Sequence, residues 1–143
     1  MEFYLRKVEK QDWDFIWALR VETMKEKIVN SYGWDEMIQR SYAEESFNGE
    51  IVIVNDQPVG VITLCDWGEQ LHLTWIAIRP ELQKKGIGTK LIQHCQEQAA
   101  KIQKPLTLQV LSNNQAISLD KRCGFKIFNE NSSGKVMMRW CAK

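Results

Sequence analysis

The chain is poor in the residues that metal sites, disulfide frameworks and membrane spans require. Its 143 residues contain two histidines and four cysteines, and no two cysteines form a C-x-x-C pair. A zinc site needs clustered thiolates or imidazoles, so we expect no metal. No apolar run approaches the ~20 residues that a membrane-spanning helix requires.

An excess of either charge sign is also missing. With 19 basic and 18 acidic side chains, the formal net charge of +1 lacks the electrostatic footprint of nucleic-acid or anionic-membrane binding. No repeat, low-complexity tract or linker divides the sequence, so we expect one domain over 1–143. The first residues are charged and lack the apolar stretch of a secretory signal, and the scattered thiols are typical of a reduced compartment. We therefore expect a cytoplasmic protein.

What is present is a clear periodic pattern, which predicts the order β-α-α-β-β-β-α-β-α-β-β. Strands are expected at 3–8, 51–54, 59–65, 71–78, 106–111, 125–128 and 135–140. Helices are expected from Asp12 to about 30–33, from 33–35 onward, from 86–88 to about 102, and over 114–122. This order predicts an α/β (α+β) fold with a mixed, mostly antiparallel sheet of about seven strands and helices on both faces. The helical crossover from 71–78 to 106–111 predicts that these two strands run parallel.

The most informative segment is the connection from the strand at 71–78 to the next helix. A strand that leads through a glycine-containing loop into a helix N-terminus offers free backbone N–H groups to an anion. Gly86 and Gly88 allow a diphosphate to approach the backbone closely, and Thr89 adds a hydroxyl. Lys84 and Lys85 add positive charge at the rim.

Two well-known phosphate loops do not fit this segment. A Walker A loop ends in Gly-Lys-Ser/Thr, which Gly-Ile-Gly-Thr-Lys at 86–90 does not supply. The dinucleotide fingerprint needs a third glycine where Leu91 stands, and an acidic residue ~20 positions later that is also missing. The remaining alternative is a tight turn with solvated lysines and no ligand.

Three motifs on the expected elements resemble the GNAT superfamily of N-acyltransferases, and together they span nearly the whole chain. Gln83-Lys84-Lys85-Gly86-Ile87-Gly88 resembles the family's Gln/Arg-x-x-Gly-x-Gly/Ala loop. The segment VLSNNQAISLDKRCGF at 110–125 resembles V-L-x-x-N-x-A-x-x-L-Y-x-x-x-G-F. Gly33-Trp34-Asp35-Glu36 followed by Gln39 is similar to a bacterial subgroup with a GWDE segment.

The resemblance implies a single GNAT-like domain that moves an acetyl group from acetyl-CoA to a primary amine of a small molecule or protein. The amine attacks the thioester directly in a ternary complex. In the family the central parallel strands splay and admit the pantetheine arm, which pairs with the strand backbone, while loop N–H groups bind the diphosphate. The residues implied for the cofactor are Ile76, Ala77, Ile78, Gln83, Lys84, Lys85, Gly86, Ile87, Gly88, Thr89 and Asn114, with Asn113 as the neighbouring alternative.

Asp120 departs from the family pattern, because a tyrosine that protonates the departing thiolate usually stands at this position. A carboxylate that is ionised at pH 7 cannot donate a proton unless its pKa is strongly raised. A thiolate is nevertheless a fair leaving group, since a free thiol has a pKa of about 8.5, so the acid could be dispensable. Two alternatives stay open for Asp120: a catalytic group, or a solvated residue of a helix.

His72 is the candidate base. Side chains alternate along a strand, so His72 shares a face with Ile76 and Ile78 and points toward the acceptor end of the implied cofactor site. An imidazole that titrates near neutrality can take the proton of an ammonium substrate. The alternative is a polar residue at the exposed beginning of the strand.

Aromatic residues gather in the N-terminal helical region, where we expect the acceptor pocket. Trp17, Tyr32 and Trp34 could cover an amine-bearing substrate, with carboxylates or π faces receiving its cation. Ordinary core packing of the helices is the alternative. The expected partners are acetyl-CoA and an amine, without nucleic acid or membrane, and a homodimer is open because many family members dimerise. The alternative function is a non-catalytic acyl-CoA-binding or sensory module with the same fold.

Overall fold

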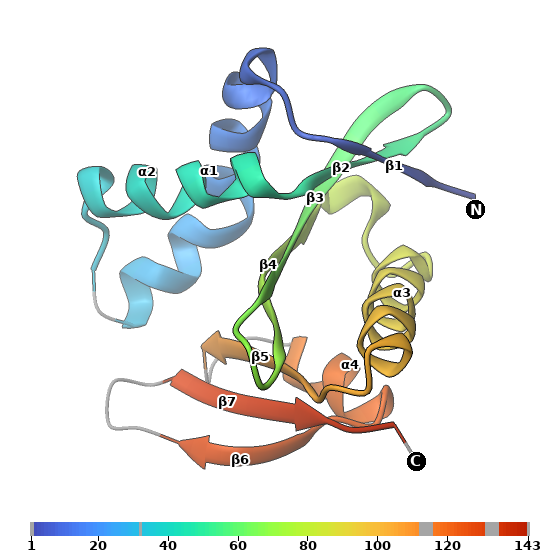
Figure 1. The fold of residues 1–143 in the computed structure, drawn as a ribbon. Helices are drawn as coiled ribbons and strands as arrows, with labels where there is room; N and C mark the ends of the chain where they lie inside the picture. The colour runs from blue at the N-terminus through green and yellow to red at the C-terminus, as the bar shows by residue number, and fades with distance from the viewer. Residues whose placement is uncertain (1, 32, 112–115, 131–134, 143) are drawn as a thin grey trace. The chain divides into compact units, whose positions relative to one another are not determined.

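The computed structural model describes residues 2–31, 33–111, 116–130 and 135–142, and its elements can be followed in Figure 1. Seven strands form one sheet in the order β1-β2-β3-β4-β5-β7-β6. The strands are β1 Tyr4–Lys7, β2 Glu50–Val54, β3 Gln57–Asp66, β4 Leu71–Ile78, β5 Leu106–Leu111, β6 Lys126–Glu130 and β7 Lys135–Trp140. The helices are α1 Trp13–Ser31, α2 Glu36–Glu44, α3 Ile87–Lys101 and α4 Ala116–Arg122, with 3-10 turns at Lys10–Asp12, Glu45–Asn48 and Pro80–Leu82.

Contacts divide the chain into two compact units, each of which is continuous with the other through β3, β4 and α3. The first unit comprises Met1–Thr63 and Trp75–Gly88. The second comprises Leu64–Thr74 and Thr89–Lys143. The expectation of one domain over 1–143 stays a prediction.

In the first unit, β1, β2 and β3 form an antiparallel meander. The turn between β2 and β3 is Asn55-Asp56, and both residues have positive φ angles, 52° and 63°. Such angles suit the two-residue turns whose twist matches that of the flanking strands, and Asn and Asp tolerate them better than most residues. The predicted hairpin is therefore present.

The helices of the first unit pack on its strands through a continuous apolar cluster. Ile16 and Leu19 of α1 and Ala43 of α2 lie in one core cluster with Ile51 and Trp75 of the sheet. Burial of each large apolar side chain contributes about 1.5–3 kcal/mol, so this cluster stabilises the helices far more than their own propensity does.

The entry to α1 is fixed by an ion pair. Asp12 is 6% exposed, and its two carboxylate oxygens accept hydrogen bonds from the Arg6 guanidinium at 2.8 Å each. One of these oxygens also accepts from the Glu9 N–H at 2.8 Å. The hydrogen bonds from Arg6, and after them the bond from Glu9 and the charge of Arg6, lower the pKa of Asp12, because they favour its ionised form.

In the second unit, β4 and β5 run parallel, as the crossover predicts, and β5, β7 and β6 follow in antiparallel pairing. Leu91, Cys95 and Ala99 recur at the helical spacing of α3 and are buried. Gln96 of the same helix donates from Nε2 to the Cys123 carbonyl oxygen at 2.8 Å, at the end of α4. The prediction of a mixed, mostly antiparallel sheet is confirmed. None of the helices in the described ranges is both long and apolar enough to cross a membrane.

We expect Gly60→Ala to destabilise the first unit, because β3 and β4 approach closely there. A Cβ at Gly60 would lie 2.4 Å from the Ala77 carbonyl oxygen and 2.7 Å from Cδ1 of Ile78. Overpacking of this kind should lower the free energy of unfolding by about 2 kcal/mol or more, measured by urea denaturation. Gly68→Ala is the control, because a Cβ there meets nothing within 4 Å and only its φ of +91° costs about 1 kcal/mol. If Gly60→Ala lowered the free energy of unfolding no more than Gly68→Ala does, the close approach of β3 and β4 at Gly60 would be contradicted.

Candidate functional site

Strand β4 changes its hydrogen-bonding direction along its length. The Leu71 N–H donates to the Pro105 carbonyl on the β5 side, whereas the Arg79 N–H donates to the Val59 carbonyl on the β3 side. The two residues are separated by an even number of positions, so regular alternation would point both N–H groups to the same edge. The alternation is therefore interrupted once between them, as at a β-bulge.

Registered pairing between β4 and β5 covers only the beginning of each strand. The pairs are Leu71 with Leu106, His72 with Thr107, and Leu73 with Leu108. Strand β4 continues to Ile78 and β5 continues to Leu111. The resemblance places the pantetheine arm along the last residues of β4, Ile76 to Ile78.

The resemblance assigns three residues at this end of β4 to pantetheine, and their carbonyl groups do not all point to the same edge of the strand. The Ala77 carbonyl oxygen faces β3, since it lies against Gly60. Alternation then turns the backbone groups of Ile76 and Ile78 to the opposite edge. The Ile78 carbonyl there already accepts a hydrogen bond from Gln83 Nε2 at 2.9 Å. Ala77 is thus turned away from the edge to which its predicted role would require it to point.

The turn from β4 to α3 has the backbone geometry of an anion site. Lys84 and Gly86 have left-handed φ angles of 63° and 89°, and φ of the intervening Lys85 is negative. Alternating φ signs of this kind are typical of a nest, in which successive N–H groups converge on one point. Helix α3 begins immediately afterwards at Ile87, where further N–H groups have no intrahelical partner. The Ile87 side chain is buried, so only its backbone can contribute.

His72, in the second unit, is buried rather than exposed. It is 4% exposed, its Nδ1 lies 2.8 Å from the Thr107 hydroxyl oxygen, and the Trp67 ring stacks on it with centroids 3.7 Å apart. Gln70 Nε2 donates to the same hydroxyl at 3.1 Å. Burial lowers the pKa of His72 to about 4, because desolvation disfavours the charged imidazolium.

Two expectations for His72 are therefore wrong. It is not a polar residue at an exposed strand end, and it does not titrate near neutrality. An efficient general base has a pKa close to the working pH, which a group with a pKa of about 4 lacks. The interrupted alternation of β4 also removes the reason to place His72 on the face of Ile76 and Ile78.

Asp120 lies on α4 and is 3% exposed, so the alternative of a solvated helix residue is wrong. Burial raises its pKa to about 7, because the ionised carboxylate loses hydration. A raised pKa is the condition that an aspartic acid must meet to donate a proton near pH 7. Burial and the charge of Asp120 also raise the pKa of Cys123, so this thiol is not an activated nucleophile.

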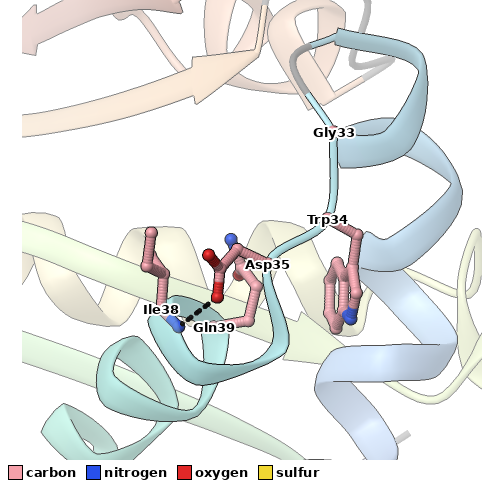
Figure 2. Close-up of a pocket in the computed structure, with 5 residues that line it drawn as sticks. All are labelled: Gly33, Trp34, Asp35, Ile38 and Gln39. Carbon is pink, nitrogen blue, oxygen red and sulfur yellow. Dashed lines mark hydrogen bonds between the residues drawn. The ribbon is translucent and has the colours of Figure 1, made fainter.

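The first unit contains a pocket of about 290 Å³ at the start of α2 (Figure 2). Its lining residues are Gly33, Trp34, Asp35, Ile38 and Gln39. The Asp35 carboxylate caps the helix by accepting from the Ile38 N–H at 3.2 Å, which Figure 2 shows as a dashed line. The Trp34 ring lies 6.0 Å from that of Trp17, tilted by 43°.

The pocket coincides with the GWDE segment and includes two residues, Ile38 and Gln39, for which we predicted no role. Ile38 and Gln39 line it, and Gln39 is 1% exposed and accepts from Arg20 Nε at 2.9 Å. The motif could have indicated a role for Gln39, because this residue follows the GWDE segment in the pattern. Of the other predicted contacts, Tyr32 and Asn114, with its alternative Asn113, lie outside the described residues.

The tryptophan faces near this pocket already receive cations of the protein itself. The Arg40 guanidinium lies 4.6 Å from the ring centroid of Trp17, and the Lys25 ammonium lies 5.7 Å from that of Trp34. Each contact is a cation–π interaction worth about 0.5–1 kcal/mol at an exposed site. A substrate cation would have to compete with these side chains for the same faces.

Comparison with known proteins identifies the family. Residues 47–127 match the family model described as an acetyltransferase (GNAT) domain. The chain belongs to the GNAT acetyltransferase family. As a GNAT member it is an acetyltransferase that uses acetyl-CoA as its cosubstrate. No curated protein sequence matches the chain.

Solved structures share the fold of this GNAT protein over nearly its whole length. PaiA N-acetyltransferase from Thermoplasma acidophilum, crystallised with coenzyme A, has a TM-score of 0.79 at 17% identity, covering 99% of this chain and 100% of that one. Ribosomal-protein-S18-alanine N-acetyltransferase from Escherichia coli gives 0.73 at 18%, covering 98% and 94%. Arabidopsis thaliana Naa50 in complex with a bisubstrate analogue gives 0.74 at 16%, covering 99% and 100%. At these identities the likeness shows the fold.

The raised pKa of Asp120 should make stability depend on pH. Between about pH 4 and 7 the folded state holds a proton that the unfolded state releases, so the free energy of unfolding falls by about 1.4 kcal/mol per pH unit from this group. Asp120→Asn removes that contribution. Measured by urea denaturation at each pH, the free energy of unfolding of the variant should rise relative to that of the wild type between pH 4 and 7. The difference should not increase further above pH 7.

Asp66→Asn is the matched control for this experiment. Asp66 is exposed and paired with Lys104 at 2.9 Å, and the hydrogen bond from Lys104 lowers its pKa. Because that stabilisation is already complete above the unfolded pKa of about 3.9, the stability difference between Asp66→Asn and the wild type should stay constant from pH 4 to 7. A constant difference between Asp120→Asn and wild type from pH 4 to 8 would contradict the raised pKa.

Proposed function

We propose that this enzyme transfers the acetyl group of acetyl-CoA to a primary amine of a small molecule or protein by direct attack in a ternary complex. The observation that carries the proposal is the nest at Lys84 to Gly86, which leads directly into the N-terminus of α3. Nests and helix N-termini both favour anions, because their N–H groups and dipoles point at the ligand. The diphosphate of acetyl-CoA then binds the backbone from Lys84 to Thr89.

The pantetheine arm is proposed to lie along the edge of β4 to which Ile76 and Ile78 point. Ile76 offers both its N–H and its carbonyl, whereas the Ile78 carbonyl is shared with Gln83. An N–H group at this edge can also donate to the thioester oxygen as it becomes an oxyanion in the transition state. Ala77 has no part in this pairing, because its carbonyl faces β3.

In the proposed reaction the amine nitrogen attacks the thioester carbonyl carbon, the C–S bond breaks, and the amine gives up its proton to water. The departing thiolate takes a proton from Asp120. A carboxyl group with a pKa of about 7 is partly protonated at neutral pH, and transfer to a thiolate whose conjugate acid has a pKa of about 8.5 is downhill. Support for this role comes from the burial of Asp120 and from its position in the motif, where the family has tyrosine.

The acceptor is proposed to enter the pocket at Trp34, whose ring lies against that of Trp17, with Asp35 in the pocket lining. The volume of about 290 Å³ suits a small amine or the end of a peptide better than a large molecule. Because Lys25 and Arg40 already cover the indole faces, recognition of the amine falls to the Asp35 carboxylate rather than to π faces. None of the four cysteines, all of which lie in the described residues, forms a disulfide, and this supports a cytoplasmic location, where thiols stay reduced.

The placement of the diphosphate predicts the effect of Gly86→Gln. A side chain at this position, with φ at +89°, strains the nest and obstructs the approach of the diphosphate to the backbone. Calorimetry should find affinity for CoA reduced at least about tenfold. Lys85→Ala should weaken binding by less than about 1 kcal/mol, because an exposed charge is screened while the N–H groups remain. Unchanged affinity of the Gly86 variant would refute the placement.

The role of Asp120 predicts a pH dependence of turnover. In the wild type, kcat should fall above about pH 7 as Asp120 ionises, and Asp120→Asn should lower kcat about tenfold and remove this decline. Asp120→Tyr should support turnover and move the decline toward about pH 10, where phenols titrate.

Thiol release from acetyl-CoA with polyamines, amino acids, aminoglycosides and peptides is the assay for this prediction. Asp66→Asn serves as the control, since Asp66 is exposed and paired with Lys104. Initial-velocity lines should intersect, as a ternary complex requires. Parallel lines with an acetyl-cysteine adduct would refute direct transfer, and CoA binding without thiol release for any amine would favour a non-catalytic module.

A further inference from the structure

Gln83 reaches from the exposed loop back to the end of strand β4. Its Nε2 donates to the Ile78 carbonyl at 2.9 Å, and its own N–H donates to the Pro80 carbonyl at 3.2 Å. The side chain of Gln83 is therefore occupied by the protein backbone before any cofactor arrives. The resemblance counts this residue among the cofactor contacts, a role that the hydrogen bond does not explain.

The bond joins the two parts of the proposed cofactor site. Ile78 ends the strand along which the pantetheine is proposed to lie, and the nest begins at Lys84, directly after Gln83. Lys84 holds a left-handed φ of 63°, which a side-chain-bearing residue adopts at a cost and keeps only where neighbouring contacts enforce it. The 3-10 turn at Pro80–Leu82 fixes the loop from one side, and the Gln83 side chain fixes it from the other.

The chemistry of the bond also accounts for the residue types at this motif position. A carbonyl oxygen requires a donor, and glutamine and arginine side chains both end in N–H groups on flexible stems. Glutamate has similar length and no donor when ionised. The alternation of Gln and Arg in the motif therefore matches a demand for a donor to a backbone carbonyl.

We propose that Gln83 is a positioning residue, whose hydrogen bond to the Ile78 carbonyl holds the nest at Lys84 to Gly86 in its anion-binding conformation before the cofactor binds. The proposal rests on the diphosphate placement given above. Gln83 acts through the backbone N–H groups that it orients, and it makes no contact with the cofactor. Binding of a diphosphate then costs less ordering of the loop, which is the usual gain from preorganisation.

Three variants and two ligands test this. Gln83→Met keeps the side-chain length without a donor, Gln83→Arg restores a donor, and Gln93→Met makes the same replacement at an exposed site of α3. Calorimetry should find that Gln83→Met weakens CoA and ADP by the same factor, roughly three- to tenfold, as loss of one hydrogen bond predicts. Gln83→Arg should recover most of the affinity, and Gln93→Met should match the wild type. In kinetics the KM for acetyl-CoA should rise in Gln83→Met while kcat stays unchanged.

The decisive readout is made on the free protein. In ¹⁵N relaxation measurements without ligand, backbone order parameters of Lys84 to Gly86 should fall in Gln83→Met and recover in Gln83→Arg. Weaker binding with unchanged order parameters would show that Gln83 touches the cofactor directly and would overturn the proposal. Unchanged affinity in Gln83→Met would overturn it too, and so would tighter binding of CoA but not ADP, which would mean that Gln83 competes with pantetheine for Ile78. If Gly86→Gln also leaves CoA affinity unchanged, the diphosphate placement itself fails; if only Gln83→Met does, this inference alone fails.

Discussion

The one constraint on which the site depends is that β4 must serve two neighbours and still leave backbone groups free. Its first residues pair with β5, and its end is hydrogen-bonded to β3. A regular strand would keep pointing the same alternate residues to each side, so the two demands are compatible only with an interruption of the alternation. That interruption turns Ile76 and Ile78 to the edge away from β3. The chain gives up ladder hydrogen bonds there, and a cosubstrate with amides of its own can replace them.

Desolvation shifts the pKa values of two buried groups of the second unit in opposite directions. Burial lowers the pKa of His72 to about 4 and raises that of Asp120 to about 7, because in both cases the charged form loses hydration. The imidazole becomes a neutral partner of Thr107, whereas the carboxyl group becomes an acid in the neutral range. The same physical cause thus withdraws one candidate from proton transfer and makes the other suitable for it.

The fold could be predicted well from the sequence, because turns, helix caps and short connections between elements determine it locally. Asn55-Asp56 set a hairpin, Asp35 caps α2, and the helix between β4 and β5 required parallel strands. The family loop was also evident from its glycines. Burial of His72 and Asp120 could not be predicted, since it depends on which elements cover them in space. The direction of the Ala77 carbonyl could not be predicted for a related reason, because an interrupted strand has the same apolar pattern as a regular one.

The nest at Lys84 to Gly86 has a consequence for how the enzyme responds to its surroundings. Peptide N–H groups do not titrate in the physiological range, and their directions are set by φ rather than by side-chain identity. In the proposed placement of the diphosphate, a change in pH that alters the protonation of Asp120 therefore leaves the N–H groups that would bind it unchanged. If both proposed roles hold, a drift in pH would change the turnover number while leaving the affinity for acetyl-CoA at this loop unchanged.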